Sequence, residues 1–446
     1  MDGCVTGEVP TIGAFKLAAL SCERIQLRAV EPVQLVQWIA VGLLVVKSLT
    51  EWFLDRLNAA HIRRHADRVP KEFEDIMTPE VYRKSVDYSL AKAKLSQLGN
   101  PYDLGVLLLF LFSGLLSWSQ TVVTGALGNS VWVGAFYLIL MTLLLSFTGL
   151  PWDWYSQFRL EERFGFNKST LGLWISDRIK GVLLAVIIGV PLVALLLKLV
   201  EIGGSAWWLY GWGTIILFQL VMMVIAPMWI LPLFNKLEPM EEGPLRDRLL
   251  KLGEATGFSA STILVMDGSK RSAHSNAFFT GFGRFRKIVL FDTLIEQLSI
   301  EELEAVLAHE IGHYKKKHVL KLLGWSCLSL LASFWVLSFL IDYSPFFEAF
   351  GLTNGGSAPV AFLLFSLLSG AVTFWTTPLS SAWSRKFEYE ADAFAANAVG
   401  NADPLIGALK KLSEKNLSNL TPHPRYSQFY YSHPTLVERS DALTKA

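Results

Sequence analysis

A short segment of the sequence concentrates side chains that can hold a metal ion. It reads His309-Glu310-Ile311-Gly312-His313, with two histidines four positions apart. In a helix this spacing puts both imidazoles on one face, where they can reach one ion at about 2.1 Å. Glu310 lies beside them and can act as a general base toward a water molecule. The pattern predicts His309 and His313 as zinc ligands, and the alternative is a surface helix with two histidines.

A catalytic zinc ion usually has three protein ligands and one open position, so a third ligand is expected elsewhere. Farther along the chain, Glu388 and Asp392 are four positions apart in a helical pattern and share a face, whereas Glu390 points in another direction. Taken alone, this segment reads as a solvated charged helix. The membrane spans described next make Glu388 the expected third ligand. They make Asp392 an acceptor for the outer nitrogen of a ligating histidine.

Seven apolar stretches are long enough to cross about 30 Å of hydrocarbon, which takes roughly 20 helical residues. His313 precedes the sixth stretch and Glu388 follows the seventh. An out-and-back hairpin therefore returns both residues to the same membrane face. Pro227 and Pro232 predict a kink or an early exit in the fifth stretch. The stretches are Pro32–Leu54, Leu104–Val123, Val131–Leu150, Ile179–Val200, Ser205–Leu231, Val319–Ile341 and Pro359–Trp383.

Basic residues alternate between the segments that join these stretches. Residues 55–103 contain nine Lys or Arg and residues 151–178 contain four, while 124–130, 201–204 and 342–358 contain none. Loops rich in Lys and Arg stay on the cytoplasmic side of a membrane. The alternation predicts an outside or lumenal N-terminus and a cytoplasmic C-terminus, in the bacterial inner membrane or the endoplasmic reticulum.

The composition indicates a multi-pass membrane protein in contact with lipid, with some soluble mass. Of 446 residues, 52% are hydrophobic and 18% are charged, whereas soluble domains carry about 25% charged residues. The chain has 40 basic and 39 acidic residues, and the net charge of +1 gives no support to nucleic-acid binding. The three cysteines lie far apart, which argues against a disulfide framework and against a zinc site built from cysteines.

The chain divides into five segments on this basis. Residues 1–31 form a tail that we expect to be disordered, and residues 32–234 hold spans one to five. Residues 235–318 form a soluble segment with the paired histidines, and residues 319–383 hold spans six and seven. Residues 384–446 form a second soluble segment that carries Glu388.

Segment 235–318 predicts a small α+β unit. Ser299 and Glu302 form a capping box, which starts a helix near Ile300. No breaker follows until well into span six, and we interpret Lys315 to His318 as a collar at the membrane interface. The other predicted elements are a helix Glu242–Thr256, strands Thr262–Met266, Asn276–Gly281 and Lys287–Phe291, and a turn Gly283–Arg286.

Three further polar residues are candidates for roles near a substrate. His433 and Arg439 can hold the oxyanion of a tetrahedral intermediate, on neighbouring turns if Pro434 begins a helix. The alternatives are a surface turn for His433 and a brace to a carboxylate for Arg439. Asn276 can anchor a peptide beside an exposed sheet edge, or it is an ordinary strand-end residue.

Several long strings of the sequence are similar to one family. On these strings the chain resembles the type I CAAX prenyl endopeptidases, which are integral-membrane zinc metalloproteases, over roughly Val33 to Arg439. The strings are Leu150-Pro151 with Glu161–Lys168, Gly268–Phe278, Ile288–Leu294, His309–His313 and Phe387–Asp392.

The resemblance implies an all-α multi-pass fold in which seven transmembrane helices enclose a water-filled chamber, with a small α+β cytoplasmic zinc protease domain. It implies one zinc ion per chain and removal of the aaX tripeptide from proteins prenylated at a C-terminal cysteine motif. A quality-control protease for damaged membrane proteins is the alternative, and a seven-span transporter or receptor is a remote one. The implied residues are the ligands His309, His313 and Glu388, the base Glu310, and Asn276, His433 and Arg439 near the substrate.

Overall fold

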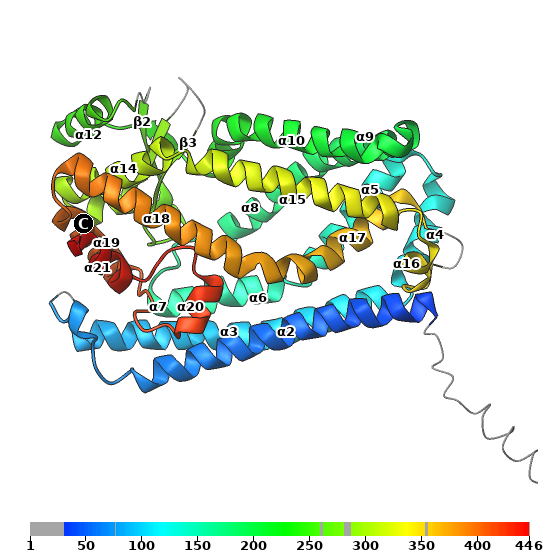
Figure 1. The fold of residues 1–446 in the computed structure, drawn as a ribbon, viewed down its shortest axis with the longest axis horizontal. Helices are drawn as coiled ribbons and strands as arrows, with labels where there is room; N and C mark the ends of the chain where they lie inside the picture. Colours follow the sequence, from blue (N-terminus) through cyan, green and yellow to red (C-terminus); the bar gives the residue numbers. More distant parts are fainter. Residues whose placement is uncertain (1–30, 76, 259–261, 281–286, 353–355, 446) are drawn as a thin grey trace, which may run out of the picture.

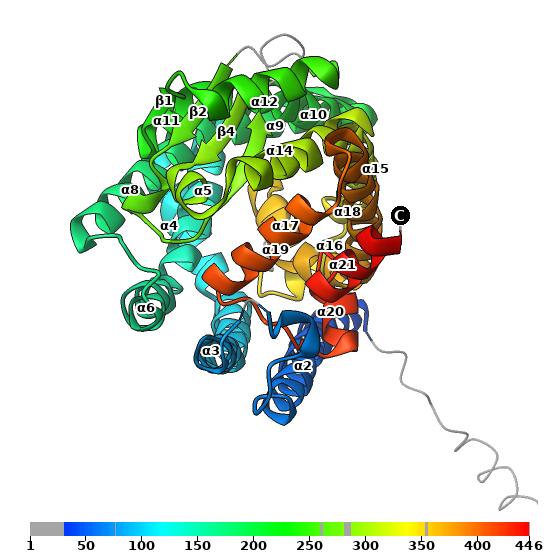
Figure 2. The same cartoon turned by 90° about the vertical axis from the view of Figure 1, so that its left-hand side faces the viewer.

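The computed structural model describes residues 31–445 except 76, 259–261, 281–286 and 353–355. Long helices run along the molecule, and a small sheet lies at one end beside the C-terminal helices (Figure 1). Viewed from that end, the long helices are arranged in a ring (Figure 2). The expected tail and the turn at 283–286 lie outside the described residues, except for Glu31.

Each of the seven predicted spans lies in a helix or a bent helix pair. Among the described residues, five helical stretches are long and apolar enough to cross a membrane, and up to seven if each bent pair is one span. The five are α2 (Pro32–Arg64), α8 to α9 (Leu171–Ile202), α10 to α11 (Gly204–Phe234), α15 (His318–Leu340) and α17 to α18 (Ala358–Val399).

Each of the two bent pairs breaks beside a glycine or a proline that disrupts regular helix. α3 (Pro79–Phe112) meets α4 (Leu115–Leu127) at 55°, and Gly114 between them has the left-handed φ of 80°. α5 (Val131–Phe147) meets the next helical stretch, Leu150–Phe164, at 44°. Pro151 stands in the first turn after this second break and cannot donate to a preceding carbonyl. The predicted second span is therefore interrupted at Gly114, and the predicted third span ends at the second bend.

Other helices contain shorter irregularities. The fifth predicted span does not end early at Pro227, because a π-helical turn at Ala226–Ile230 carries the helix on to Phe234. The bounds on either side of the π-helical turns are α6 Leu150–Tyr155, α7 Glu162–Phe164, α8 Leu171–Leu184, α9 Val190–Ile202, α10 Trp207–Ile225 and α11 Leu231–Phe234; α17 Ala358–Thr373 and α18 Thr377–Val399 are joined by a 3-10 turn.

A four-stranded sheet forms within the described residues, in the order β1-β2-β4-β3. The strands are β1 (Leu237–Pro239), β2 (Thr262–Met266), β3 (Ala277–Thr280) and β4 (Lys287–Phe291). β2 runs parallel to β4, with Leu264 opposite Val289, and the other two pairs are antiparallel. β2 and β4 have the predicted bounds. β3 is an edge strand beside α14, so its outer side is not paired with another strand of this sheet.

The sheet packs with helices from both predicted soluble segments around an apolar core, which includes Leu249, Ile263, Leu290, Leu307 and Leu405. These residues come from five helices and strands on both sides of the membrane hairpin, so the two predicted soluble segments form one unit. The helices still to be named are α12 Pro244–Ala255, α13 Asp292–Gln297, α14 Ile300–Lys315, α16 Ser344–Glu348, α19 Asp403–Lys415, α20 Pro424–Tyr430 and α21 Leu436–Lys445.

Helix α14 begins as predicted and ends earlier than predicted. The Ser299 hydroxyl accepts from the Glu302 amide at 3.3 Å, and the Glu302 carboxylate accepts from the Ser299 amide at 2.7 Å. A continuous helix into span six is wrong, because α14 ends at Lys315 and α15 begins at His318. Lys317 between them has the left-handed φ of 58°. No glycine or proline marks this break in the sequence.

Helices α14 and α18 approach each other until their backbones touch. A Cβ atom added to Gly312 of α14 would lie 3.0 Å from the Ala391 Cα and 3.1 Å from its carbonyl oxygen. Those atoms belong to backbone, so they cannot move aside as a flexible side chain does. The contact places the paired histidines of α14 directly against the acidic face of α18.

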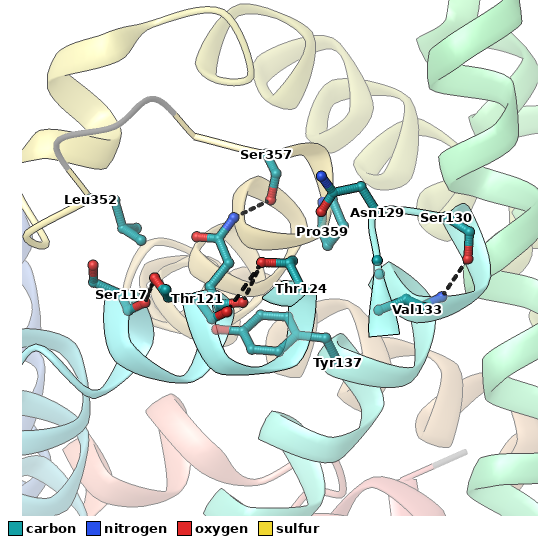
Figure 3. A pocket seen from close by; sticks show the side chains of 13 residues that line it. Ser117, Thr121, Thr124, Asn129, Ser130, Val133, Tyr137, Leu352, Ser357 and Pro359 are labelled. Carbon is teal, nitrogen blue, oxygen red and sulfur yellow. Dashed lines mark hydrogen bonds between the residues drawn. The ribbon is translucent and has the colours of Figure 1, made fainter. Parts of the chain in front are cut away.

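A polar cavity of about 480 Å³ lies between α4, α5 and the start of α17, at the end of the molecule opposite the sheet (Figures 1 and 3). The Gln120 amide donates to the Ser357 hydroxyl across it at 2.9 Å. None of its lining residues is Asp, Glu, His, Lys or Arg. It is therefore separate from the ionisable cluster described next.

We expect Gly312→Ala to lower the unfolding temperature and the bound metal content together. The added methyl group would force α14 and α18 apart, and overpacking of this kind costs about 1–3 kcal/mol. Gly324→Ala on α15 is the matched control, since a Cβ there meets no atom within 4 Å. Differential scanning fluorimetry in detergent with elemental analysis measures both effects. Equal behaviour of the two variants would show that the helix contact does not set the geometry.

Candidate metal centre

Three predicted ligand residues converge between α14 and α18. One atom from each of His309, His313 and Glu388 lies within 4.8 Å of the others, in an arrangement that can hold a metal ion. The two histidine Nε2 atoms are 3.0 Å apart. Glu388 places Oε2 3.5 Å from Nε2 of His309 and Oε1 3.3 Å from Nε2 of His313. The hairpin of α15 and α17 to α18 brings these residues together, as the sequence predicts.

The hydrogen bond at Nδ1 of His309 determines whether its Nε2 presents a proton or a lone pair to the cluster. His309 Nδ1 lies 2.8 Å from Asp392 Oδ1. A carboxylate accepts hydrogen bonds, so Nδ1 carries the proton and Nε2 presents a lone pair toward the cluster. This is the contact that the sequence predicts for Asp392.

The cluster needs a positive charge among its acceptors. Burial opposes a charge on His309, yet the adjacent carboxylates of Asp392 and Glu388 raise its pKa to about 9. Glu388 Oε2 is buried and has no hydrogen-bond partner among the described residues. A cation placed between the three residues would satisfy this oxygen and both lone pairs. Two imidazoles and a carboxylate are also donors that zinc favours, so the residues fit a zinc ion.

Arg439 lies behind the cluster and donates two hydrogen bonds to the Asp392 carboxylate, one to each oxygen. Its Nε donates to Oδ2 at 2.8 Å, and its Nη2 donates to Oδ1 at 2.6 Å. Its Nη1 is 3.6 Å from Glu388 Oε2. The guanidinium is 9% exposed and already engaged with carboxylates. This geometry favours the bracing alternative for Arg439 over the oxyanion alternative.

Glu310 lies beside the ligands on α14. Burial raises its pKa, and the nearby histidines His309 and His313 partly offset the rise. A carboxyl group with a raised pKa is better matched to proton transfer near neutral pH than an exposed one. No described residue donates a hydrogen bond to Glu310 in the structure, so its oxygens are free to bind a water molecule or a substrate proton.

His433 faces the cluster from the loop before α21. Its Nε2 is 3.4 Å from Glu388 Oε1, and its side chain is 63% exposed. It also lines a cavity of about 340 Å³. The expectation that Pro434 begins a helix is wrong: α21 starts at Leu436, where the Glu438 carboxylate accepts from the Thr435 amide at 2.7 Å. His433 and Arg439 therefore meet at Glu388 from a loop and a helix, and not from neighbouring turns.

Asn276 is exposed and directly precedes β3. Its side-chain oxygen accepts from the Ala277 amide at 2.8 Å, and its backbone carbonyl accepts from the Phe291 amide at 3.1 Å. These contacts fix Asn276 at the start of the edge strand that lies beside α14. The position is compatible with the predicted contact to a peptide laid along that edge.

The sequence interpretation gave no role at the metal centre to His318 or Glu390. Lys315, Lys316 and Lys317 are exposed as predicted for an interfacial collar, but His318 is buried at 2% exposure and contacts His313 and Glu390. A histidine five positions after His313 would point away on an unbroken helix. Its role depends on the break at Lys317, which no sequence signal marks.

Comparisons with known proteins match the chain to one family over most of its length. Residues 58–236 match the family model for the CAAX prenyl protease N-terminal region with five membrane helices, and residues 239–446 match peptidase family M48. CAAX prenyl protease 1 of Saccharomyces cerevisiae is 38% identical over 404 residues, which cover 84% of this chain and 88% of the relative. The homolog from Oryza sativa is 36% identical and covers 90% and 96%.

A crystal structure is similar over nearly the whole chain. Ste24p of S. mikatae matches with a TM-score of 0.83 at 34% identity, covering 92% of this chain and 98% of that one. The fold and the site define a multi-pass membrane metalloprotease. The chain belongs to peptidase family M48, in the group of the CAAX prenyl protease 1 proteins. The resemblance found in the sequence is confirmed, and membership of a peptidase family argues against a transporter or a receptor.

We expect Arg439→Met to destabilise the protein by about 3–5 kcal/mol, because it removes the guanidinium that neutralises the buried Asp392 carboxylate. The double variant Asp392→Asn with Arg439→Met should be less destabilised than the sum of the two single variants, as expected for residues in contact. Unfolding in denaturant measures all three. Strict additivity would contradict the bracing role of Arg439.

Proposed function

We propose that this chain is a zinc-dependent endopeptidase that removes the aaX tripeptide from proteins prenylated at a C-terminal cysteine motif. The observation that carries the proposal is the convergence of His309, His313 and Glu388 beside Glu310, in a chain 38% identical to a CAAX prenyl protease 1. Within the part of the chain that the structure describes, no feature favours the quality-control alternative. The proposed cofactor is one zinc ion per chain.

The residues of the chain supply most of the proposed mechanism. A zinc ion held by His309, His313 and Glu388 would act as a Lewis acid toward the scissile carbonyl group. Glu310 accepts a proton from the attacking water molecule and passes it to the leaving amine. His433, exposed and adjacent to Glu388, donates an N–H to the developing oxyanion.

The substrate is positioned by the edge of the sheet. A peptide that pairs with the free side of β3 runs alongside α14, and Asn276 at the start of this strand anchors it. Asp392 and Arg439 hold the ligand His309 in place from behind. These residues therefore act on the substrate indirectly, through the geometry of the ligands.

The proposed membrane arrangement has seven spans enclosing a chamber. The alternation of basic and uncharged loops supports an N-terminus outside and a metal centre at the cytoplasmic face. In a eukaryotic host this membrane is the endoplasmic reticulum, and in a bacterial host it is the inner membrane. A lipid-modified cysteine and a cytoplasmic active site fit one another, because the prenyl group stays in the bilayer while the peptide reaches the metal.

Purified protein should contain about one zinc ion per chain and should cleave a farnesylated CAAX peptide while leaving the unprenylated peptide intact. Elemental analysis and mass spectrometry of the released tripeptide measure both. Glu388→Ala should lose zinc and activity together. Normal zinc content with full activity in that variant would contradict the assignment of Glu388 as a ligand. Equal cleavage of both peptides would contradict the assignment of a prenylated substrate.

Glu310→Gln should keep its zinc and lose turnover by about 10²–10⁴-fold, because the amide cannot accept the proton while the ligands stay intact. Glu296→Gln is a control substitution of the same kind at an exposed position on α13. A folded Glu310→Gln protein that cleaves at the normal rate would contradict the role of the base.

His433→Ala and Asn276→Ala should affect different kinetic constants. Loss of an oxyanion donor lowers kcat by about a hundredfold or more while zinc stays bound. Loss of a strand anchor mainly raises KM. Steady-state kinetics with the farnesylated peptide separates the two effects, and an unchanged kcat in His433→Ala would leave His433 as a loop residue.

A further inference from the structure

A second chain of hydrogen bonds leaves the metal centre through His313. We propose that His318 and Glu390 are positioning residues that hold His313 in the tautomer and orientation needed to bind the metal. The inference rests on the proposed zinc site and adds two residues to it. It concerns proton placement and geometry, so it can be tested by metal affinity without reference to activity.

The contacts are short and continuous. His313 Nδ1 and His318 Nδ1 are 3.0 Å apart, and His318 Nε2 is 3.0 Å from Glu390 Oε2. His318 is 2% exposed and stacks on Phe387, with ring centroids 4.1 Å apart and planes within 11°. The buried imidazole is therefore fixed on its face by an aromatic ring and at both nitrogens by partners.

The hydrogen-bonding capacity of each group sets the proton positions along the chain. A carboxylate only accepts, so His318 carries its proton on Nε2 and donates it to Glu390. The other nitrogen of His318 is then bare and must accept from His313 Nδ1. His313 consequently has its proton on Nδ1 and presents a lone pair at Nε2, the atom that lies in the cluster.

Both ligating histidines are thereby held from outside, but by routes of different length. His309 reaches a carboxylate directly at Asp392, which Arg439 braces. His313 reaches a carboxylate only through the imidazole of His318. Outer partners of this kind orient metal-bound histidines and raise their basicity.

The break between α14 and α15 makes the second route possible. On a continuous helix, a residue five positions later lies about 140° away around the axis. The left-handed conformation of Lys317 turns the chain so that His318 lies beside His313. The break between α14 and α15 therefore accounts for the position of His318 beside His313.

The outer end of the route reaches the surface. The Glu390 side chain is 30% exposed, and Lys321 Nζ lies 3.7 Å from the oxygen that faces His318. Lys321 also lies over the Phe387 ring, 5.0 Å from its centroid. An exposed pair of this type contributes little energy, so Lys321 is a suitable control position.

The hydrogen-bond relay from His313 through His318 to Glu390 can be tested by zinc affinity. This affinity is measured by competition with a chelating dye on the full-length protein. His318→Phe keeps the stacking on Phe387 but removes both nitrogens, and we expect about 10–100-fold weaker zinc binding. In His318→Gln, the amide oxygen can accept from His313 and the amide nitrogen can donate to Glu390. This variant should recover most of the lost affinity, and Lys321→Met should bind as the unaltered protein does.

Glu390→Met gives a second approach if His318→Phe does not fold, because Glu390 is partly exposed; it should also weaken zinc binding. Wild-type affinity in His318→Phe or in folded Glu390→Met overturns the relay, and so does equal loss in His318→Phe and His318→Gln, which indicates packing alone. Absence of zinc binding by the unaltered protein would instead overturn the proposed function. The outcomes are therefore distinguishable.

Discussion

The contact between the backbones of α14 and α18 is the constraint on which the metal centre depends. Gly312 allows an approach that no other residue permits without displacing Ala391. Ala391 lies between Glu390, which contacts His318, and Asp392, which contacts His309. It also lies three positions after Glu388. A single close contact thus fixes the distance from the histidine face of one helix to the acidic face of the other.

The second requirement is balance among buried charges. Glu388 and Asp392 are almost fully buried, and an isolated carboxylate in such a place would be costly. Arg439 supplies one positive charge behind the cluster, and the raised pKa of His309 indicates that the cluster attracts another. The fold therefore creates a site whose electrostatics favour a cation at the position where the ligands meet.

Much of this arrangement follows from local sequence patterns. The capping box at Ser299, the strands β2 and β4, the apolar stretches and the spacing of His309 and His313 depend on neighbouring residues, and they can be read directly. The position of Glu388 needed one step of topology, the hairpin. The break at Lys317 and the burial of His318 depend on contacts with Glu390 on another helix, which local patterns do not contain. The start of α21 after His433 was missed for a simpler reason, because Thr435 and Glu438 compete with Pro434 as a helix start.

The unequal connections of the two site helices to the bilayer have a mechanical consequence. The histidine helix α14 is joined to α15 through a non-helical hinge, whereas Glu388 lies on a helical stretch that continues from the membrane, Ala358–Val399. Helices tilt when bilayer thickness changes. A continuous helix carries tilting of α17 to α18 along its backbone to Glu388. His318 begins α15 and contacts His313, so tilting of α15 reaches the metal centre through that side chain and not through helical backbone. The two sides of the metal centre are therefore coupled to the bilayer differently, one through a continuous helix and the other through an imidazole contact.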